Sequence, residues 1–304
     1  MTETIFNDLE QVLSGQLKYN EPMSRHTSWR VGGPAEVLVE PSGMVDIKTA
    51  CEYARDKKIP LTVIGNGSNL LVSDYGIKGM VLKIGKGLSD IEIDNETIMA
   101  GAGAKLSRIA AAAGAAGVGG LEFMAGIPGT LGGAVVMNAG AYGKSISQVL
   151  KRVSLINQNG QVSCQEQENI IFDYRSSSLQ ESGLIVTEGV LEGYLRDEKQ
   201  IKDDMKDMGE KRRSSQPLNY PNAGSVFRNP PGYSAGKLIE ESGAKGLRVG
   251  DAQVSEKHAN FIINLGSATA EDILQLIERV QRMVEKRFGI RLKKEIRVLG
   301  RFLR

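Results

Sequence analysis

The glycine-rich stretch from Gly126 to Gly143 is the first part of this sequence whose residue types suggest chemistry. It reads Gly-Ile-Pro-Gly-Thr-Leu-Gly-Gly-Ala-Val-Val-Met-Asn-Ala-Gly-Ala-Tyr-Gly, and residues 101–143 hold 12 of the 36 glycines in the 304-residue chain. Glycine tolerates positive φ and lets main-chain N–H groups approach a ligand, so successive N–H groups can form an anion site without a charged side chain. The stretch favours a phosphate-bearing cofactor over the alternative, tight turns beside an Ala-rich helix.

A second glycine-rich turn, Gly65-Asn66-Gly67-Ser68-Asn69, follows the strand-like run at residues 61–64. Ligands of α/β proteins commonly bind at the carboxyl ends of strands. A Walker A motif is excluded because only two residues separate Gly140 from Gly143 before Lys-Ser. A Rossmann fingerprint is excluded because leucine replaces the third glycine after both Gly65-x-Gly67 and Gly101-x-Gly103. We therefore expect two loops that grip one diphosphate outside an ordinary Rossmann site.

Three further segments carry side chains suited to catalysis. They are Tyr174-Arg175-Ser176-Ser177, Gly224-Ser225-Val226-Phe227-Arg228-Asn229-Pro230 and Lys294-Glu295-Ile296-Arg297. Each alone has a structural explanation: a surface arginine, a serine in a turn, and a strand glutamate that balances basic neighbours. A serine hydrolase is disfavoured, because Ser225 does not lie in Gly-x-Ser-x-Gly and the chain has only two histidines.

Seven segments, taken in order, resemble the UDP-N-acetylenolpyruvoylglucosamine reductases, flavoenzymes of bacterial peptidoglycan precursor synthesis. The segments are Arg30-Val-Gly-Gly33, Ile64-Gly-Asn-Gly-Ser-Asn69, Gly126-Ile-Pro-Gly-Thr-Leu-Gly-Gly133, Asn138-Ala-Gly-Ala-Tyr-Gly143, Tyr174-Arg-Ser-Ser177, Gly224-Ser-Val-Phe-Arg-Asn-Pro230 and Glu295. The resemblance runs from about Thr27 to the end of the chain. It implies an α+β protein with an FAD-binding fold of the vanillyl-alcohol-oxidase/cytochrome-hydroxylase type, in two α+β subdomains, plus a C-terminal α+β substrate-binding domain.

The resemblance also implies a reaction and three catalytic residues, Arg175, Ser225 and Glu295. Hydride passes from NADPH to FAD and then to the enolpyruvyl ether of UDP-N-acetylglucosamine-enolpyruvate, which becomes UDP-N-acetylmuramate. Arg175 would polarise the substrate carboxylate, and Glu295 in its protonated form would donate a hydrogen bond to it. Ser225 would supply a proton to the adjacent carbon.

Binding positions are carried over in the same way. The resemblance implies FAD contacts at Ile64, Gly65, Asn66, Gly67, Ser68, Asn69, Gly126, Ile127, Pro128, Gly129, Thr130, Gly132, Gly133 and Ala134. It implies substrate contacts at Tyr142, Arg228, Asn229 and Lys237. We expect FAD to be bound non-covalently, with His26 in a structural role, and we expect no metal. The chain resembles the family members that lack an inserted tyrosine-bearing loop, because residues 191–216 contain only one charged helix.

Two alternatives remain: a flavin-dependent oxidase of the same fold, and a non-catalytic flavin-binding module, because a fold alone does not establish turnover. NADPH consumption with and without the UDP-sugar separates the reductase from the oxidase. The presence of all three catalytic residues argues against a module without activity.

Composition narrows the possible partners and the location. The formal net charge is only +2, from 38 basic and 36 acidic residues. This charge is too small to produce an electrostatic field that attracts nucleic acid or an anionic membrane. Cys51 and Cys164 lie far apart and outside any Cys-x-x-Cys pair, so we interpret both as reduced packing thiols. No apolar stretch is long enough to span a bilayer. We therefore expect a cytoplasmic protein that uses UDP-N-acetylglucosamine-enolpyruvate and NADPH and needs no obligate protein partner.

Hydrophobic periodicity and turn residues predict the elements that position these segments. Helices are expected at residues 4–13, 44–58, 106–115, 197–213 and 234–242, and from 269 to a stop at 289. Strands are expected at residues 35–40, 61–64, 80–84, 91–93, 97–100, 149–156, 161–164, 184–191 and 258–265. A final strand at residues 290–298 alternates apolar and charged side chains, which places Glu295 on the face away from the apolar row.

The thin apolar stripe of the charged helix at residues 197–213 predicts a domain boundary in or near it. We expect an FAD-binding region at residues 1–200, with subdomains at about 1–85 and 86–200. A substrate-binding domain is expected at residues 205–293. The final strand, in residues 294–304, is then expected to return towards the FAD-binding region, so that Glu295 reaches the site.

Overall fold

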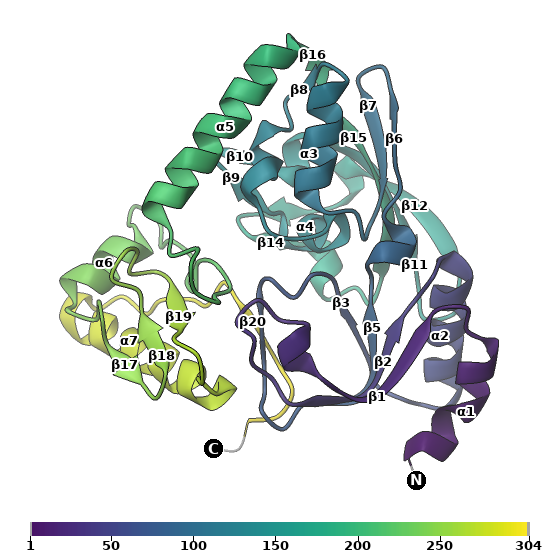
Figure 1. The fold of residues 1–304 in the computed structure, drawn as a ribbon, viewed down its shortest axis with the longest axis horizontal. Helices are drawn as coiled ribbons and strands as arrows, with labels where there is room; N and C mark the ends of the chain where they lie inside the picture. Colours follow the sequence, from purple (N-terminus) through teal and green to yellow (C-terminus); the bar gives the residue numbers. More distant parts are fainter. Residues whose placement is uncertain (1, 303–304) are drawn as a thin grey trace. The chain divides into compact units, whose positions relative to one another are not determined.

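The computed structural model describes residues 2–302, which fold into two compact units (Figure 1). Unit 1 comprises the described residues up to Tyr19, then Glu36–Asn66 and Gly79–Lys211. Unit 2 comprises Asn20–Ala35, Gly67–Lys78 and the described residues from Arg212 onward. Each unit has its own hydrophobic core, built on Ile98, Leu106 and Phe123 in unit 1 and on Trp29, Phe227 and Ile277 in unit 2.

The described residues form seven α-helices. These are α1 (Thr2–Val12), α2 (Met44–Asp56), α3 (Leu106–Ala115), α4 (Leu131–Met137), α5 (Glu198–Ser215), α6 (Ala235–Glu241) and α7 (Ala270–Phe288). Short strands outnumber them. They are β1 (Gln16–Pro22), β2 (Pro34–Glu40), β3 (Leu61–Ile64), β4 (Leu70–Val72), β5 (Ile77–Lys83), β6 (Ile91–Asp94), β7 (Thr97–Gly101), β8 (Val118–Gly119), β9 (Gly140–Ala141), β10 (Lys144–Ser145), β11 (Leu150–Ile156), β12 (Val162–Glu166), β13 (Phe172–Asp173), β14 (Ser176–Ser177), β15 (Ile185–Glu192), β16 (Tyr194–Leu195), β17 (Arg248–Val249), β18 (Ala252–Val254), β19 (Ile262–Asn264) and β20 (Arg297–Leu299).

A five-stranded antiparallel sheet forms the centre of unit 1, in the order β12-β11-β15-β7-β6. Helices α3 and α4 pack against it (Figure 1). A second sheet has the order β1-β2-β5-β3, in which β3 and β5 run parallel. The strands predicted at residues 91–93 and 97–100 are confirmed as the antiparallel pair β6 and β7.

Unit 2 contains a three-stranded sheet, β17-β18-β19, against which α7 packs. Helix α7 begins and ends where the sequence predicts. Thr269 and Asp272 form a capping box at its start, and Gly289 ends it in the left-handed conformation, with φ of 69°. Asp74 adds a second cap, since its carboxylate accepts hydrogen bonds from the backbone N–H groups of Ala270 (2.9 Å) and Glu271 (3.0 Å).

The glycine-rich stretch is not one loop, as the sequence suggested, because α4 lies in its middle. Thr130 is the extended N-cap residue of this helix, and Leu131, Ala134 and Val135 form its buried face. The helix ends at Asn138, whose φ is 43°. Its apolar residues have helical spacing, but the adjacent Gly132 and Gly133 are typical of a turn, so the sequence did not indicate a helix here.

Two predicted strands are shorter than expected. The pattern at residues 290–298 yields a regular ladder only at β20, which pairs in parallel with β4. Before it, Lys294 makes an isolated bridge with Phe227. The strand expected at residues 258–265 begins only at Ile262, because the backbone N–H of Phe261 donates to the carbonyl of His258 and closes a turn.

The two cysteines differ in environment. Burial, reinforced by the charge of Glu52, raises the pKa of the Cys51 thiol to about 11. Cys164 is exposed on β12, so its assignment as a packing thiol is wrong; its side chain lies on the open face of an edge strand.

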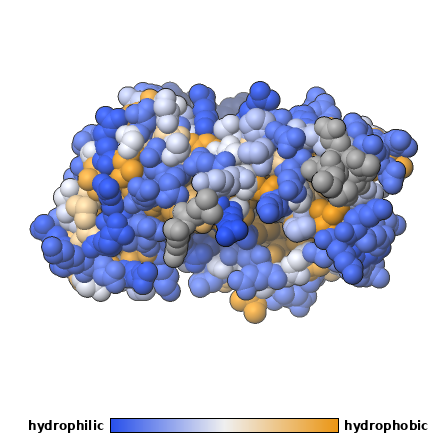
Figure 2. Space-filling model, turned by 90° about the horizontal axis from the view of Figure 1, so that it is seen from below, coloured by the Kyte–Doolittle hydropathy of each residue, from blue (hydrophilic) through white to orange (hydrophobic). Residues whose placement is uncertain are grey.

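The surface shown in Figure 2 is predominantly hydrophilic, with hydrophobic side chains in small groups. Among the described residues, no helix is both long enough and apolar enough to cross a membrane.

Candidate active site

The turn at residues 65–69 is the first of the two glycine-rich segments in chain order, and it begins at the carboxyl end of β3, in unit 1. A Cβ atom added to Gly65 would lie 2.5 Å from the hydroxyl oxygen of Thr130, so only glycine fits there without displacing that side chain. Ile64 is buried, and its carbonyl accepts a hydrogen bond from the N–H of Ile84, which fixes the end of the strand. The structure thus brings the turn after β3 against Thr130, which lies within the glycine-rich stretch from Gly126 to Gly143.

Thr130 has a feature expected of a ligand-binding residue. It is 5% exposed, yet its Oγ1 has no hydrogen-bond partner among the described residues, although the residue is the N-cap of α4. A buried hydroxyl without a partner costs about 1–3 kcal/mol. A phosphate oxygen of a bound dinucleotide would satisfy this hydroxyl, so the residues present fit FAD.

The glycines after Thr130 have two different roles. A Cβ on Gly132 would lie 3.0 Å from the Cβ of Ala102, and the N–H of Gly132 donates to the carbonyl of Ala102. Gly132 therefore allows α4 to pack closely on the chain after β7. Gly133 meets only the Thr130 hydroxyl, at 3.9 Å, and leaves open space beside it.

The second half of the first turn belongs to unit 2. Gly67 has φ of 66°, and a Cβ there would lie 1.8 Å from the carbonyl oxygen of His26. The N–H of Ser28 donates to the carbonyl of Gly67, while the Ser28 hydroxyl is buried without a partner among the described residues. Within unit 2, the second half of the turn is therefore accompanied by one buried hydroxyl that a ligand could satisfy.

His26 has a structural explanation. Its ring is 6% exposed, and Nε2 lies 2.9 Å from a carboxylate oxygen of Glu21. This contact holds the segment whose backbone packs against Gly67.

The structure pairs the backbone segments that carry Ser225 and Glu295 within unit 2. The N–H of Glu295 donates to the carbonyl of Val226, the residue after Ser225, at 2.8 Å. The N–H of Arg228 donates to the carbonyl of Lys293 at 2.9 Å, so the two segments are paired on both sides of the Phe227–Lys294 bridge. Ser225 and Glu295 are both half-buried, which leaves each side chain partly accessible to a ligand.

Glu295 is also connected to the first glycine turn. The side-chain amide of Asn69 donates to the carbonyl of Glu295 at 3.2 Å, and the N–H of Arg297 donates to the carbonyl of Asn69 at 2.9 Å. One residue of the predicted FAD set is thus hydrogen-bonded to one residue of the predicted catalytic set.

Arg175 lies in unit 1, at the tip of the hairpin formed by β13 and β14. Its φ is 56°, a left-handed conformation that costs a non-glycine residue of the order of 1 kcal/mol. Its guanidinium carbon lies 5.1 Å from the centre of the Tyr174 ring. Because Arg175 and Ser225 belong to different units, the convergence of all three catalytic side chains stays a prediction.

Side chains hold the Arg175 hairpin against the end of α4. The Asn138 amide donates to the carbonyl of Asp173 at 3.0 Å, and the Ser177 hydroxyl donates to the carbonyl of Val136 at 2.7 Å. The Gln180 amide donates to the carbonyl of Arg175 itself at 3.3 Å. The sequence motif contained Asn138, but its role becomes visible only when the partners of its side chain are known.

The predicted substrate residues lie in both units. Tyr142 is 48% exposed with φ of 55°, and its hydroxyl donates to the carbonyl of Met208 at 2.7 Å. The Asn229 side chain accepts from the N–H of Ala235, the first residue of α6. Lys237 is exposed on α6 and lies 3.7 Å from Glu241. Asn229 and Lys237 therefore have structural partners whether or not they contact substrate.

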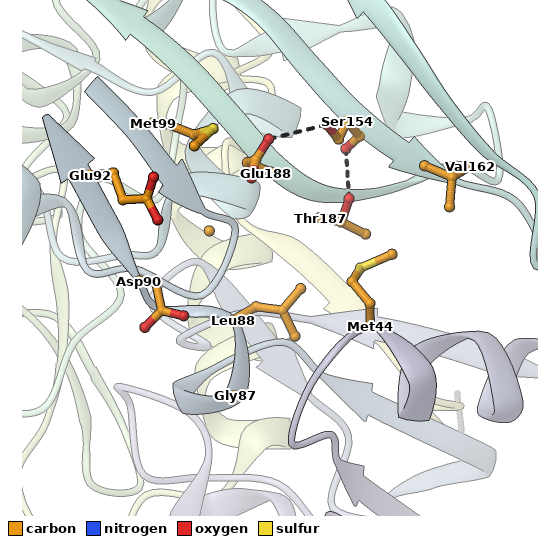
Figure 3. A pocket seen from close by; sticks show the side chains of 11 residues that line it. Met44, Gly87, Leu88, Asp90, Glu92, Met99, Ser154, Val162, Thr187 and Glu188 are labelled. Atoms are coloured by element: carbon orange, nitrogen blue, oxygen red, sulfur yellow. Dashed lines mark hydrogen bonds between the residues drawn. The ribbon is translucent and has the colours of Figure 1, made fainter. Parts of the chain in front are cut away.

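A pocket of about 350 Å³ in unit 1 contains none of the predicted site residues (Figure 3). Its lining includes Asp90, Glu92 and Glu188 beside apolar side chains. Glu188 and Gly189 are adjacent on β15 and point to opposite faces, and Gly189 faces Leu131 of α4. The pocket is therefore on the face of the sheet opposite α4. No cluster of three or more metal-binding side chains occurs in residues 2–302.

Comparisons with known proteins agree with this architecture. Residues 35–164 match the FAD binding domain model, and residues 216–299 match the C-terminal domain model of UDP-N-acetylenolpyruvoylglucosamine reductase. A protein of 14% sequence identity from Physcomitrella patens, BBE-like 1, superimposes with a TM-score of 0.54 over 92% of this chain and 88% of its own, which is a likeness of fold. The expected α+β architecture with the FAD-binding fold of the vanillyl-alcohol-oxidase type is confirmed.

Full-length similarity is much higher to one group of enzymes. The UDP-N-acetylenolpyruvoylglucosamine reductase of Desulforamulus reducens is 49% identical over 98% of each chain, and that of Caldanaerobacter subterraneus is 45% identical over 99% of each. The crystal structure of UDP-N-acetylenolpyruvylglucosamine reductase from Thermus caldophilus, 36% identical, superimposes with a TM-score of 0.82 over 95% of this chain and all of its own. This chain belongs to the UDP-N-acetylenolpyruvoylglucosamine reductase family.

Proposed function

We propose that this protein reduces UDP-N-acetylglucosamine-enolpyruvate to UDP-N-acetylmuramate, with NADPH as hydride donor and FAD bound non-covalently. Family membership over the whole chain supports the reaction. The observation that carries the proposal is the backbone pairing of the Ser225 segment with the Glu295 segment, because it joins the two segments that carry a hydroxyl and a carboxyl group in the unit that contains the family's C-terminal domain.

Bound FAD would supply the hydride chemistry that connects NADPH with the terminal carbon of the enolpyruvyl group. The protein residues have the remaining tasks. Arg175 would hold the substrate carboxylate with a fixed positive charge while electron density moves towards it. The Ser225 hydroxyl would donate a proton to the carbon next to that carboxylate, and Glu295 in its protonated form would hydrogen-bond the carboxylate. One hydride and one proton are added across the double bond, which balances the oxidation of NADPH.

FAD would be held by the two glycine-rich segments, through Ile64, Gly65, Asn66, Gly67, Ser68, Asn69, Gly126, Ile127, Pro128, Gly129, Thr130, Gly132, Gly133 and Ala134. The buried hydroxyls of Thr130 and Ser28, which have no hydrogen-bond partner among the described residues, support a phosphate-bearing ligand at the turn of residues 65–69. Substrate contacts are proposed for Tyr142, Arg228, Asn229 and Lys237.

A functional division accompanies this proposal. Residues 1–200 would bind FAD, residues 205–293 would bind the substrate, and the last residues would bring Glu295 to the site. The protein would act in the cytoplasm without nucleic acid, membrane or an obligate protein partner. The small net charge supports the absence of a nucleic-acid partner.

Anaerobic NADPH oxidation tests the reaction. The holoprotein should consume one NADPH for each UDP-N-acetylglucosamine-enolpyruvate added, and in the absence of that substrate only the single equivalent that reduces its FAD. NADPH oxidation that needs oxygen and ignores the UDP-sugar would instead identify a flavin-dependent oxidase. Tight FAD binding with no turnover under either condition would identify a non-catalytic module.

A further inference from the structure

Asn260 is a buried polar residue outside the predicted catalytic and binding sets. It is 4% exposed and precedes β19. Its Oδ1 accepts a hydrogen bond from the N–H of Phe227 at 3.0 Å, and its Nδ2 donates to the carbonyl of the same residue at 2.8 Å. Its backbone carbonyl accepts from the N–H of Val226 at 2.9 Å. One asparagine therefore holds both polar groups of Phe227 and one of its neighbour.

The opposite side of the same short segment is held by the chain around Glu295. The Val226 carbonyl accepts from Glu295, and Phe227 forms a bridge with Lys294. The side chains of Val226 and Phe227 are fully buried, which anchors the segment in the core of unit 2. The Val226–Phe227 peptide thus lies between Asn260 on one side and the Glu295 segment on the other.

This arrangement explains why the strand predicted at residues 258–265 starts late. The backbone turns at residues 258–261, so a regular strand cannot continue beside Phe227. The amide of Asn260 replaces it, since a carboxamide offers one acceptor and one donor with the spacing of a peptide group. Alanine would leave both groups of Phe227 without these bonds.

We propose that Asn260 is a positioning residue for the reduction of the enolpyruvyl group. Its amide fixes the Val226–Phe227 peptide, and through it the Ser225 hydroxyl relative to Glu295. This inference rests on the proposed function, because it requires Ser225 to deliver the proton. A displacement of about 1 Å at a reacting group can cost about 10²-fold in rate, so an indirect contact of this kind can be measured.

Asn264 is a matched control in the same unit. It is 2% exposed, its Nδ2 donates to the carbonyl of Trp29 at 3.0 Å, and its Oδ1 accepts from the N–H groups of Gly266 (2.8 Å) and Ala268 (3.0 Å). Neither side chain is exposed, and both bind backbone groups. Of the two asparagines, Asn260 alone binds the Val226–Phe227 peptide. If the two alanine variants lose equal stability but Asn260→Ala loses more activity, the effect is one of positioning and not of folding.

The test compares holoprotein variants Asn260→Ala, Asn264→Ala, Ser225→Ala and the double variant Ser225→Ala/Asn260→Ala. Anaerobic stopped-flow absorbance measures flavin reduction by NADPH and reoxidation by UDP-N-acetylglucosamine-enolpyruvate separately. Asn260→Ala should slow reoxidation by about 10- to 100-fold and change reduction by NADPH less than about twofold. Asn264→Ala should leave both rates within about twofold while it lowers the melting temperature by a similar amount. The double variant should reoxidise no more slowly than Ser225→Ala alone.

Amide hydrogen exchange gives a readout that does not depend on turnover. Exchange of the N–H of Phe227 should rise more in Asn260→Ala than in Asn264→Ala at the same loss of melting temperature. If Asn260→Ala does not fold, Asn260→Asp replaces it. The aspartate retains the shape and the acceptor but loses the donor to Phe227, and it should show the same selective loss of reoxidation.

Each result has one meaning. Slow reoxidation in Ser225→Ala together with normal reoxidation in Asn260→Ala would overturn this inference and leave the proposed function intact. Multiplicative effects in the double variant would also overturn it, because Asn260 would then act independently of Ser225. Normal reoxidation in Ser225→Ala would remove the serine from the mechanism, and the positioning role with it.

Discussion

Arg175 and Ser225 are held in place by different physical means. Arg175 occupies a strained left-handed position at a hairpin tip, and polar side chains such as Asn138 and Gln180 bind the backbone around it. Ser225 precedes two fully buried residues, and backbone pairing with the Glu295 segment fixes its position. We therefore expect that Arg175 can be substituted with little effect on the hydrophobic core of unit 1. The position of the Ser225 hydroxyl, in contrast, depends on the core of unit 2.

The largest expected effect is that of Ser225→Ala. Loss of a single general acid typically slows the affected step by about 10²- to 10⁴-fold. Reoxidation of the reduced flavin by UDP-N-acetylglucosamine-enolpyruvate should fall by this factor, while reduction by NADPH stays close to normal. Stopped-flow measurements on one preparation give both rates, and a melting curve confirms folding. If the serine only satisfies a turn, stability should fall without a selective loss of reoxidation.

Substitutions of Arg175 test whether its strain can be separated from its charge. Arg175→Ala and Arg175→Gly should both slow reoxidation by about 10²- to 10³-fold, because each removes the cation that we propose holds the substrate carboxylate. Glycine adopts φ of 56° without strain, so Arg175→Gly should be about 1 kcal/mol more stable to unfolding than Arg175→Ala. Chemical denaturation measures this difference. Equal stabilities would show that the left-handed backbone at this hairpin is not a source of strain.

Removal of the Asp74 cap probes the unit that contains Ser225. Asp74 accepts hydrogen bonds from two N–H groups at the start of α7, so Asp74→Ala should lower the free energy of unfolding by about 1–2 kcal/mol. Hydrogen exchange should increase first in α7 and in the segment around Phe227, which share one core. An increase confined to the Arg175 hairpin would contradict this division of the stabilising contacts.

A smaller, pH-dependent effect is expected in unit 1. Burial opposes ionisation of Glu40, but Lys18 at 2.6 Å and Lys83 at 2.7 Å outweigh it and lower its pKa to about 2. Because this pKa lies below the ordinary value of 4.5, the stabilisation is fully present above pH 4.5 and is lost as the pH falls towards 2. Glu40→Gln should therefore cost about 1 kcal/mol at pH 7, after allowance for the partial exposure of the carboxylate.

Denaturation curves from pH 7 to pH 2 check this prediction. The difference between the native protein and Glu40→Gln should shrink as the pH falls below 4.5. A difference that stays constant across this range would mean that the ion pairs of Glu40 do not stabilise the fold.

Local signals made much of the fold predictable. The ends of α3 and α7 follow from the spacing of apolar residues and from capping residues such as Thr269 and Gly289. These signals lie within or next to the helix that they define. Helix α4 was missed because its glycines resemble turn residues and its stability depends on packing against β15. The strand at residues 290–298 was overestimated, since its length depends on partners such as Leu70–Val72 that lie more than 200 residues earlier.

In the candidate site, too, the features with a local sequence signal were predicted, and those that depend on distant partners were missed. Motifs predicted the two glycine-rich segments, and the structure places Gly65 against Thr130. The hydrogen bonds between Asn260 and Phe227 could not be predicted, because the two residues are 33 positions apart and a lone asparagine in an apolar run carries no local signal. The supporting residues of Arg175 were missed for the same reason: Asn138 contacts the backbone of Asp173, 35 residues later.

A single turnover tests the central claim most directly. The holoprotein is reduced anaerobically with one equivalent of NADPH, freed of the nucleotide, and mixed with UDP-N-acetylglucosamine-enolpyruvate. The flavin absorbance should return completely, and mass spectrometry should find one equivalent of UDP-N-acetylmuramate, the substrate plus two hydrogens, for each FAD. A reduced flavin that stays reduced until oxygen is admitted, with the UDP-sugar recovered unchanged, would contradict the assignment of this chain as an enolpyruvyl reductase.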